Sequence, residues 1–451
     1  MLPKTKRYMF SIILNWYKSS IKQKCFRSDF VFVYHGVRRI GKTILLKQLN
    51  EEIPYSKYYD CEKYNKREDC ITDIIVNDFN KGIKVFLIDE VCKYHDLEDL
   101  KSFIKCNGEE CTFILTGSTS EFVKNIGYSI GRGPVMYLQP ITYYEWLSWE
   151  NKSDSSNLFK QSSYNKFLEF IRTGTSNIIS NPADYIKSVV VDTCESYKIR
   201  ANAGQIQLNC DDFDEEKFNI ILNYMALTSL VRKEYNGKYT KPQKFLHKDK
   251  EVTKRVNSVI SNYQKLINGY KNDEIRKYLM VLTSSGLVNN HRSPVSDINS
   301  EEYWVFRYPQ YIYEIIGSNT LDSNIFVSVI VENLLLDAVS NYYDYASKYR
   351  DATQREIDIC YRLPLGSYGI EIKCRPVDKI NVDLYRSIAS DIGLCDISFT
   401  ACDIIDPLVV KAGKYVIRPD ILMLIYEVAY TQNDYNKLSL NDLLIEFKLV
   451  D

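Results

Sequence analysis

The stretch GVRRIGKT at residues 36–43 follows the apolar run VFVYH at residues 31–35 and precedes the helix-forming run ILLKQL at residues 44–49. A phosphate-binding P-loop needs this order of strand, G-x-x-x-x-G-K-T loop and helix. The glycines let backbone N–H groups curl around phosphates, and the helix N-terminus favours negative charge. Lys42 is expected to contact the β- and γ-phosphates, and Thr43 to offer its hydroxyl to Mg²⁺. The predicted ATP site comprises Gly36, Arg38, Gly41, Lys42 and Thr43.

A second apolar run, VFLIDE at residues 85–90, ends in two carboxylates. A buried strand that ends in Asp-Glu can have structural causes alone. Downstream of a P-loop it is typical of a Walker B strand. In that role Asp89 holds Mg²⁺ through water and Glu90 positions the attacking water.

Two further features follow these motifs. The strand expected at residues 112–115 leads into TGSTS at residues 116–120, where Ser118 is a candidate contact to the γ-phosphate or the attacking water. The alternative is a strand-to-helix turn with Ser caps. Arg132, in the run IGRG, stands at a distance typical of an arginine finger that acts across a subunit interface. The alternative for Arg132 is an exposed loop residue with no such role.

These motifs together resemble a family of archaeal and bacterial AAA-type ATPases that lies near the signal-transducing STAND ATPases. Members carry G-x-R-x-x-G-K-T, L-D-E, T-G-S, G-R and P-L-S-F-x-E. The corresponding stretches here are GVRRIGKT, LIDE, LTGS, Gly131-Arg132 and LQPITYYEW at residues 138–146. The resemblance covers the first 150 residues and implies a nucleotide-dependent ATPase, with a homo-oligomer formed through this domain as a candidate assembly. In this family a winged helix and a C-terminal domain that resembles the PD-(D/E)XK nucleases commonly follow.

The residues that match such a nuclease-like domain lie in REIDIC at residues 355–360 and GIEIKC at residues 369–374. Mg²⁺ prefers carboxylate oxygens, and a hairpin of the two strands would bring Asp358 and Glu371 together. Strand alternation places Lys373 on the face of Glu371, where it could orient water or stabilise a pentacovalent phosphate. The predicted metal ligands are Glu332, Asp358 and Glu371, with Glu371 and Lys373 as catalytic residues. Taken alone, E-x-K is an ordinary pattern on a half-exposed strand.

Between these parts, three helical runs and two short strands over residues 218–316 follow the order of a winged helix. Residues 232–255 within it carry nine Lys and Arg residues against three acidic ones, interleaved with three aromatic residues. Such a cluster is a candidate phosphate-contacting surface for nucleic acid. A solvated basic loop is the alternative.

Composition excludes several other classes of protein. The 451 residues carry 58 basic and 58 acidic side chains, so the balance is not that of a protein that coats nucleic acid. The 12 cysteines have no paired C-x-x-C spacing, which excludes a zinc ribbon. Several of them lie inside apolar strand-like runs, which favours reduced core cysteines in a cytoplasmic protein. No apolar run reaches 18 residues, so no membrane span is expected.

The predicted fold is α/β, in four parts. An AAA-type P-loop ATPase domain with a parallel sheet spans residues 1–150, a helical lid 151–215, a winged helix 216–318 and a restriction-endonuclease-like α/β domain 319–451. The expected function is ATP binding and hydrolysis by a protein that acts on, or is regulated by, nucleic acid, with DNA as the expected form and metal-dependent cleavage as a further activity. The alternative is a non-nucleolytic ATP-dependent switch whose C-terminal fold is an interaction or assembly module.

Overall fold

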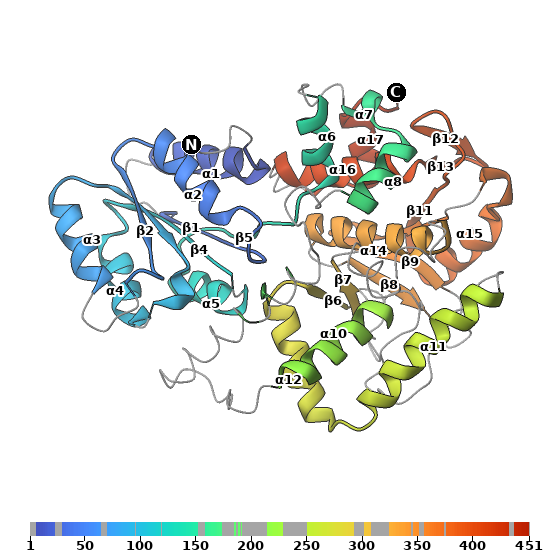
Figure 1. Ribbon diagram of the computed structural model, residues 1–451. Helices are drawn as coiled ribbons and strands as arrows, with labels where there is room; N and C mark the ends of the chain where they lie inside the picture. The colour runs from blue at the N-terminus through green and yellow to red at the C-terminus, as the bar shows by residue number, and fades with distance from the viewer. Residues whose placement is uncertain are drawn as a thin grey trace. The chain divides into compact units, whose positions relative to one another are not determined.

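A computed structural model of the chain divides into two compact units (Figure 1). Unit 1 comprises residues 1–141, 184–214 and 280–287, and unit 2 comprises residues 142–183, 215–279 and 288–451. The structure describes residues 6–22, 29–64, 70–94, 96–118, 120–151, 158–173, 185, 188–189, 191, 214–228, 250–292, 302–307, 324–343, 346–350, 356–373, 376–432 and 437–450.

Unit 1 contains a parallel five-stranded sheet in the order β2-β3-β4-β1-β5. The strands are β1 (Val31–His35), β2 (Ser56–Asp60), β3 (Val85–Asp89), β4 (Thr112–Gly117) and β5 (Val135–Tyr137). The three central strands are fully buried, which explains their continuous apolar runs. The edge strands β2 and β5 are partly exposed or very short, and their weak patterns did not predict them. The expected parallel α/β sheet is confirmed.

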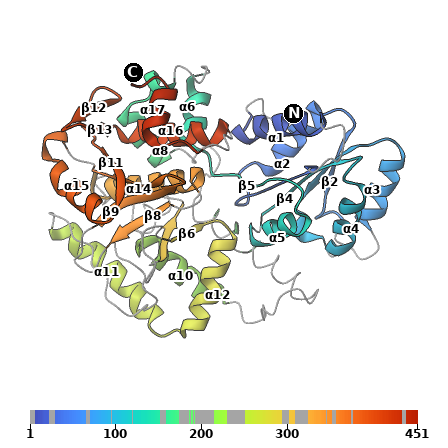
Figure 2. The same ribbon diagram turned by 180° about the vertical axis from the view of Figure 1, so that it is seen from behind.

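Helices cover both faces of this sheet (Figures 1 and 2). On one face, α3 (Ile71–Asn80), α4 (Leu97–Asn107) and α5 (Ser120–Ile130) share a core with alternate strand residues such as Phe86 and Ile88. On the other face lie α1 (Tyr8–Ser20) and α2 (Lys42–Glu52). Because all five strands run the same way, the segments that follow β1, β3 and β4 meet at one edge.

The C-terminal part of unit 2 is built on a mixed six-stranded sheet in the order β12-β13-β11-β10-β9-β8. The strands are β8 (Ala346–Arg350), β9 (Glu356–Leu363), β10 (Gly366–Glu371), β11 (Leu394–Thr400), β12 (Leu408–Lys411) and β13 (Lys414–Ile417). Strands β8, β9 and β10 form an antiparallel meander, and α15 (Val382–Asp391) connects β10 to the parallel strand β11. This order brings the two predicted carboxylate strands, β9 and β10, side by side.

Four of the described helices contribute to the rest of this fold: α14 (Asn324–Tyr342), α15, α16 (Pro419–Gln432) and α17 (Leu440–Glu446). Residues of α15 such as Val382 and Ile388 share a core with Phe399 of β11. Tyr343, Tyr361 and Tyr426 form a separate aromatic cluster, in which the rings of Tyr343 and Tyr361 stack with centroids 4.2 Å apart.

The predicted lid, residues 151–215, is divided between the two units. Its described helices α7 (Leu158–Gln161) and α8 (Tyr164–Thr173) pack against α6 (Tyr143–Asn151) in unit 2, and α8 also packs against α16. The buried Ser162 hydroxyl donates to Asp420 of α16 at 2.5 Å, and Arg418 donates to the Ser162 carbonyl at 2.9 Å. Residues 184–214 belong to unit 1 instead. Buried polar contacts thus hold the segment between α7 and α8 to α16. A separate lid over the whole range stays a prediction.

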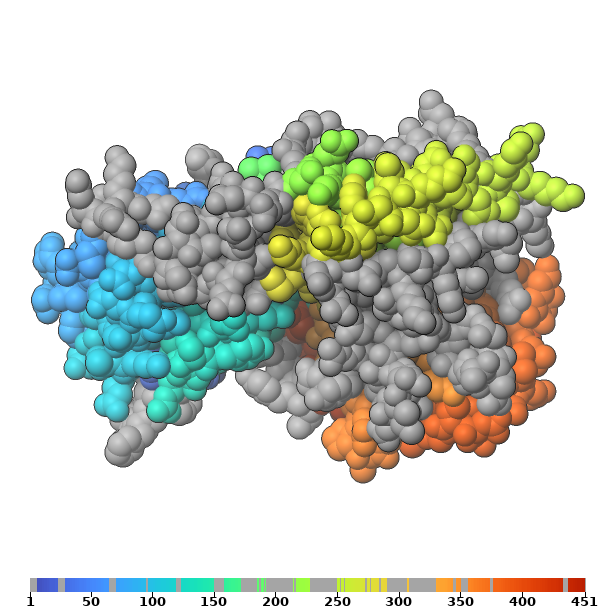
Figure 3. Space-filling model, turned by 90° about the horizontal axis from the view of Figure 1, so that it is seen from below, coloured from blue at the N-terminus to red at the C-terminus, as the bar shows by residue number. Residues whose placement is uncertain are grey.

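Among the described residues of the predicted winged helix, 216–318, lie three helices and a two-stranded ribbon, and the winged helix itself stays a prediction. They are α10 (Glu215–Thr228), α11 (Lys250–Ile267) and α12 (Asn272–Ser284), followed by the antiparallel strands β6 (Val288–Arg292) and β7 (Glu302–Phe306). Figure 3 shows the surface of α11 and α12 in yellow. Most of the basic stretch at residues 232–255 lies outside the described residues. Among the helices that are described, none has the length and apolar character needed to cross a bilayer.

Candidate functional site

The predicted P-loop connects β1 to α2 at the carboxyl edge of the parallel sheet. A side chain at Gly36 would meet the Leu138 carbonyl oxygen at 2.5 Å, so only glycine fits there. Gly41 has φ +96°, a left-handed conformation that glycine adopts without strain, and Arg39 has φ +62°. The loop therefore curls back on itself directly before the first turn of α2.

Lys42 lies inside this loop with 4 % of its surface exposed. Its Nζ donates to the carbonyl oxygens of Gly36 at 3.0 Å and Val37 at 2.9 Å, and it lies 3.9 Å from Glu90 Oε1. Burial lowers the pKa of Lys42, and the nearby Glu90 and Asp89 carboxylates oppose that shift. The ammonium is thus held at the centre of the loop.

Asp89 ends β3 and faces the same edge, almost fully buried. Its side chain is hydrogen bonded to Thr43, and Tyr58 donates to its Oδ2 at 2.9 Å. Burial, and after it the charge of Glu90, raise the pKa of Asp89 to about 6 although these hydrogen bonds and Lys42 oppose the rise. A hydroxyl beside a carboxylate is a donor set of hard oxygens, which suits Mg²⁺.

Glu90 stands in a left-handed conformation with φ +49°. Its Oε1 accepts the Ser118 hydroxyl at 2.5 Å, and its Oε2 accepts the Ser118 backbone N–H at 3.1 Å. Ser118 follows β4, so strands β3 and β4 bring these two predicted residues together. The predicted members Lys42, Thr43, Asp89, Glu90 and Ser118 form one group.

Arg132 lies elsewhere. Its backbone carbonyl accepts N–H bonds from Phe30 at 3.0 Å and Val31 at 2.9 Å, at the start of β1, and its side chain is exposed. This is the amino end of the strand whose carboxyl end leads into the P-loop. Arg132 and the P-loop of the same chain are therefore at opposite ends of β1.

Three residues near the P-loop were not predicted. Tyr58 reaches Asp89 from the edge strand β2, Arg7 donates to the Ile40 carbonyl, and Tyr185 donates to the Arg38 carbonyl at 2.7 Å. Apart from Tyr58, which lies in a weakly patterned strand, no signal in the sequence pointed to them. Their contacts join residues 31 to 147 positions apart.

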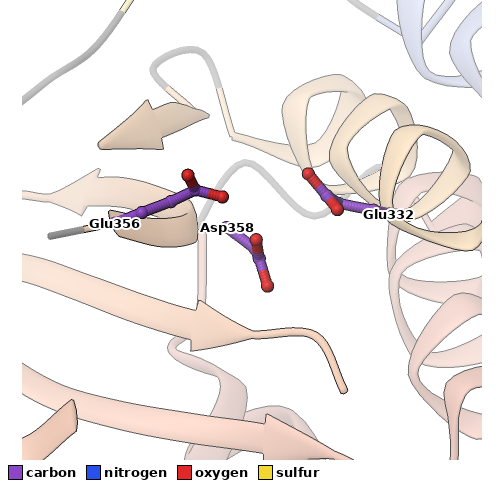
Figure 4. Close-up of side chains that lie close together, drawn as sticks. All are labelled: Glu332, Glu356 and Asp358. Carbon is purple, nitrogen blue, oxygen red and sulfur yellow. The ribbon is translucent and has the colours of Figure 1, made fainter. Parts of the chain in front are cut away.

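A second candidate site lies on the C-terminal sheet. Carboxylate oxygens of Glu332 on α14 and of Glu356 and Asp358 on β9 lie within 4.8 Å of one another (Figure 4). Glu332 and Asp358 are fully buried. The structure adds Glu356 to the expected set. The sequence already contained a signal for it, because Glu356 and Asp358 are two residues apart in a strand and so lie on one face of β9. Lys348 on β8 pairs with Glu332.

Asp358 also connects this cluster to Glu371 and Lys373. The Asp358 backbone N–H donates to Glu371 at 3.3 Å, and Lys373 Nζ pairs with Glu371 and lies 3.7 Å from Asp358 Oδ2. Burial, and after it the Asp358 charge, raise the pKa of Glu371 well above its usual range. Burial lowers the pKa of Lys373, but the two carboxylates outweigh it and raise this pKa overall. Glu332, Glu371 and Lys373 therefore all lie around Asp358.

Comparison with known proteins supports the N-terminal part of this description. A family model described as an AAA domain matches residues 28–147. No curated protein matches the chain. The chain is similar to the Walker-type ATPase of Pyrococcus abyssi, with a TM-score of 0.36 and 12 % identity over 70 % of this chain and 98 % of that one.

Two further solved structures have lower scores. RuvB of Thermotoga maritima has a TM-score of 0.29 and 15 % identity, over 63 % of this chain and 88 % of that one. The ORC1 protein of Aeropyrum pernix, solved in complex with DNA, has a TM-score of 0.24 and 10 % identity, over 69 % of this chain and 91 % of that one. The region that matches the AAA domain contains the P-loop, β3 with Asp89 at its end, the following Glu90, and also Ser118 and Arg132.

Proposed function

We propose that the AAA-like part of unit 1 binds ATP with Mg²⁺ and hydrolyses it. The observation that carries this proposal is the convergence of Lys42, Thr43, Asp89, Glu90 and Ser118 at the carboxyl edge of the parallel sheet. The match of residues 28–147 to an AAA domain supports it.

The residues fit the group they would hold. Thr43 and Asp89 are adjacent hard-oxygen donors, and a cation beside Asp89 favours its ionised form. Bound Mg²⁺ supplies charge stabilisation at the phosphates. Lys42 binds phosphate oxygens by exchanging its carbonyl contacts for them. Glu90 orients a water molecule and accepts its proton at a carboxylate oxygen, and Ser118 holds that carboxylate in place.

Nucleotide binding is tested with Lys42→Ala. The variant removes a charge-assisted hydrogen bond of about 1.5–3 kcal/mol, so its affinity for a non-hydrolysable ATP analogue with Mg²⁺ should fall about ten-fold or more. Isothermal titration calorimetry measures this. Lys84→Ala is the matched control, because Lys84 pairs with Glu110 at the amino end of β3, away from the P-loop. Equal affinities for wild type and Lys42→Ala would contradict the assignment.

Metal-dependent cleavage of nucleic acid by the C-terminal sheet is a second candidate function. The carboxylate cluster beside Lys373 favours it, since such oxygens bind Mg²⁺ and a lysine there can orient water or stabilise a developing phosphate charge. The order α14, β8, β9, β10, α15, β11 supports a PD-(D/E)XK-like domain at residues 319–451. A winged helix at residues 216–318 that contacts DNA completes the proposed organisation.

Cleavage is tested by incubating single- and double-stranded DNA and RNA with the full chain, ATP, and Mg²⁺ or Mn²⁺. We expect metal-dependent products that Glu371→Ala abolishes and that the control Glu446→Ala, an exposed position on α17, leaves unchanged. Absence of cleavage on every substrate would favour the alternative, an ATP-dependent switch whose C-terminal fold is an interaction module.

A further inference from the structure

The carbonyl oxygens of the P-loop are held by groups on several sides. Lys42 Nζ donates to the carbonyl oxygens of Gly36 and Val37. The Tyr34 hydroxyl donates to the Lys42 carbonyl oxygen at 2.9 Å. Two more are held by residues far away in the sequence, Arg7 and Tyr185. A P-loop must bind anions, so a carbonyl oxygen turned toward the phosphates would repel them.

Arg7 is the residue directly before α1, and it is 8 % exposed. Its Nη1 donates to the Ile40 carbonyl, and its Nη2 donates to the carbonyls of Gln139 at 2.7 Å and Pro140 at 3.4 Å. One guanidinium thus holds the P-loop backbone to the segment that follows β5. Its planar fork suits this task, since it presents several N–H donors in fixed directions.

Tyr185 acts at a neighbouring peptide. Its side chain is 4 % exposed, and its hydroxyl donates to the Arg38 carbonyl at 2.7 Å. The Ile40 and Arg38 carbonyls are therefore each held by a side chain that is itself buried. Both residues belong to unit 1.

Because the peptide group is planar and trans, holding its carbonyl oxygen also fixes the direction of the following N–H group. Its C=O and the following N–H point in opposite directions, and none of the described peptide bonds is cis. Holding the Ile40 carbonyl at Arg7 therefore directs the Gly41 N–H away from Arg7. Holding the Arg38 carbonyl at Tyr185 likewise directs the Arg39 N–H away from Tyr185. Backbone N–H groups that face the anion are the phosphate donors of a P-loop.

We propose that Arg7 and Tyr185 are positioning residues for nucleotide, which hold two P-loop carbonyls outward so that the Gly41 and Arg39 N–H groups face the phosphates. This inference rests on the proposed ATP binding. Neither residue is assigned a contact with nucleotide. Arg7 also has a simpler explanation, that it only anchors α1, and the two explanations differ in what they predict for affinity.

The experiment measures the Kd of a non-hydrolysable ATP analogue with Mg²⁺ by calorimetry, with thermal melts of the nucleotide-free chain in parallel. Arg7→Met should raise Kd about ten-fold, because binding must then order a P-loop carbonyl that Arg7 no longer holds, and the lost charge-assisted hydrogen bonds set the scale of that cost. Arg7→Lys, which keeps the charge but not the fork, should fall between Arg7→Met and wild type. Tyr185→Phe removes only a hydroxyl and should raise Kd roughly three-fold or more, as for one neutral hydrogen bond. Lys6→Met, at the neighbouring exposed position, should match wild type.

The outcomes separate the possibilities. A lower melting temperature with unchanged Kd in Arg7→Met and Tyr185→Phe would overturn the inference and leave Arg7 as an anchor for α1. If Arg7→Met does not fold, Arg7→Lys and Tyr185→Phe still decide, because an unchanged Kd in both is equally negative. A wild-type chain that binds no nucleotide would overturn the proposed function itself, and this inference with it.

Discussion

At the scale of single residues, the geometry of Glu90 is the most informative feature of unit 1. A non-glycine residue at φ +49° is uncommon, and such conformations cost of order 1–3 kcal/mol. Here it directs the carboxylate toward Ser118 and to within 3.9 Å of Lys42. The strained residue is thus the one proposed to orient water.

Glu90→Gln should keep nucleotide binding and slow hydrolysis. The amide preserves the size of the side chain and one acceptor oxygen but cannot accept a proton, so we expect kcat to fall about 100-fold or more. Steady-state phosphate release gives kcat, and calorimetry gives the affinity. Glu110→Gln, the same change at an exposed position, should behave as wild type. Hydrolysis by Glu90→Gln at the wild-type rate would show that Glu90 has another role.

At the scale of elements, the start of α6 is held by two carboxylates. Thr142 and Glu145 cap it reciprocally, since the Thr142 N–H donates to Glu145 at 3.2 Å and the Glu145 N–H donates to Thr142 at 3.1 Å. Glu427 of α16 accepts the next two N–H groups, those of Tyr143 at 3.0 Å and Tyr144 at 2.6 Å. Helix α6 is therefore fixed to α16 by its own orphan donors.

This contact predicts a pH dependence of stability. Burial, helped by the charge of Glu145, raises the pKa of Glu427 to about 8 although the two N–H bonds oppose the rise. The folded state then binds a proton that the unfolded chain releases near its ordinary pKa of ~4.3. The resulting stabilisation is complete below that value and is lost as pH rises through about 8.

Glu427→Gln isolates the effect, because the amide cannot titrate. Between pH 5 and pH 9 the wild-type Tm should fall by several degrees relative to that of the variant. Each kcal/mol of lost stability lowers the Tm of a domain of about 150–250 residues by ~2–4 °C. Thermal melts of the full chain by circular dichroism measure this, with Glu446→Gln as the exposed control. A Tm difference between wild type and Glu427→Gln that is the same at every pH would exclude Glu427 as the titrating group.

At the scale of the whole molecule, the position of Arg132 bears on assembly. Arg132 lies beside the start of β1, and the P-loop begins after its end. The four steps from Val31 to His35 span roughly 13 Å at ~3.3 Å per residue, which is beyond the reach of an arginine side chain. An arginine finger at this position must therefore act on the nucleotide of another subunit.

Mixing two inactive variants tests this arrangement. Arg132→Ala keeps an intact P-loop, and Lys42→Ala keeps an intact Arg132, so a mixed interface restores one complete site. We expect the mixture to recover part of the wild-type ATPase rate, and the wild-type rate per subunit to rise with protein concentration. The loss in Arg132→Ala alone should reach about 1000-fold if it acts as an arginine finger. Co-assembly by light scattering without recovered activity would argue against a role in trans.

The sequence by itself determined what depends on neighbouring residues. The strand, loop and helix of residues 31–49 follow from an apolar run, two glycines and a helix-forming run, and the parallel α/β sheet follows from repeating that alternation. The strand ends then bring Lys42, Asp89 and Ser118 together, because parallel strands end at one edge. The alternation of faces along β9 likewise places Glu356 beside Asp358, and the two-residue spacing was the one signal in the sequence for this carboxylate.

The tertiary structure alone decided which distant groups complete each site. Arg7 reaches Ile40 and Gln139 across 33 and 132 positions, and Glu427 reaches Tyr143 across 284. No local pattern encodes such pairs, because a buried N–H or C=O accepts a partner from any element that the fold brings near it. The division of the predicted lid has the same cause. Ser162, between α7 and α8, bonds to α16 in unit 2, while Tyr185 reaches the P-loop in unit 1.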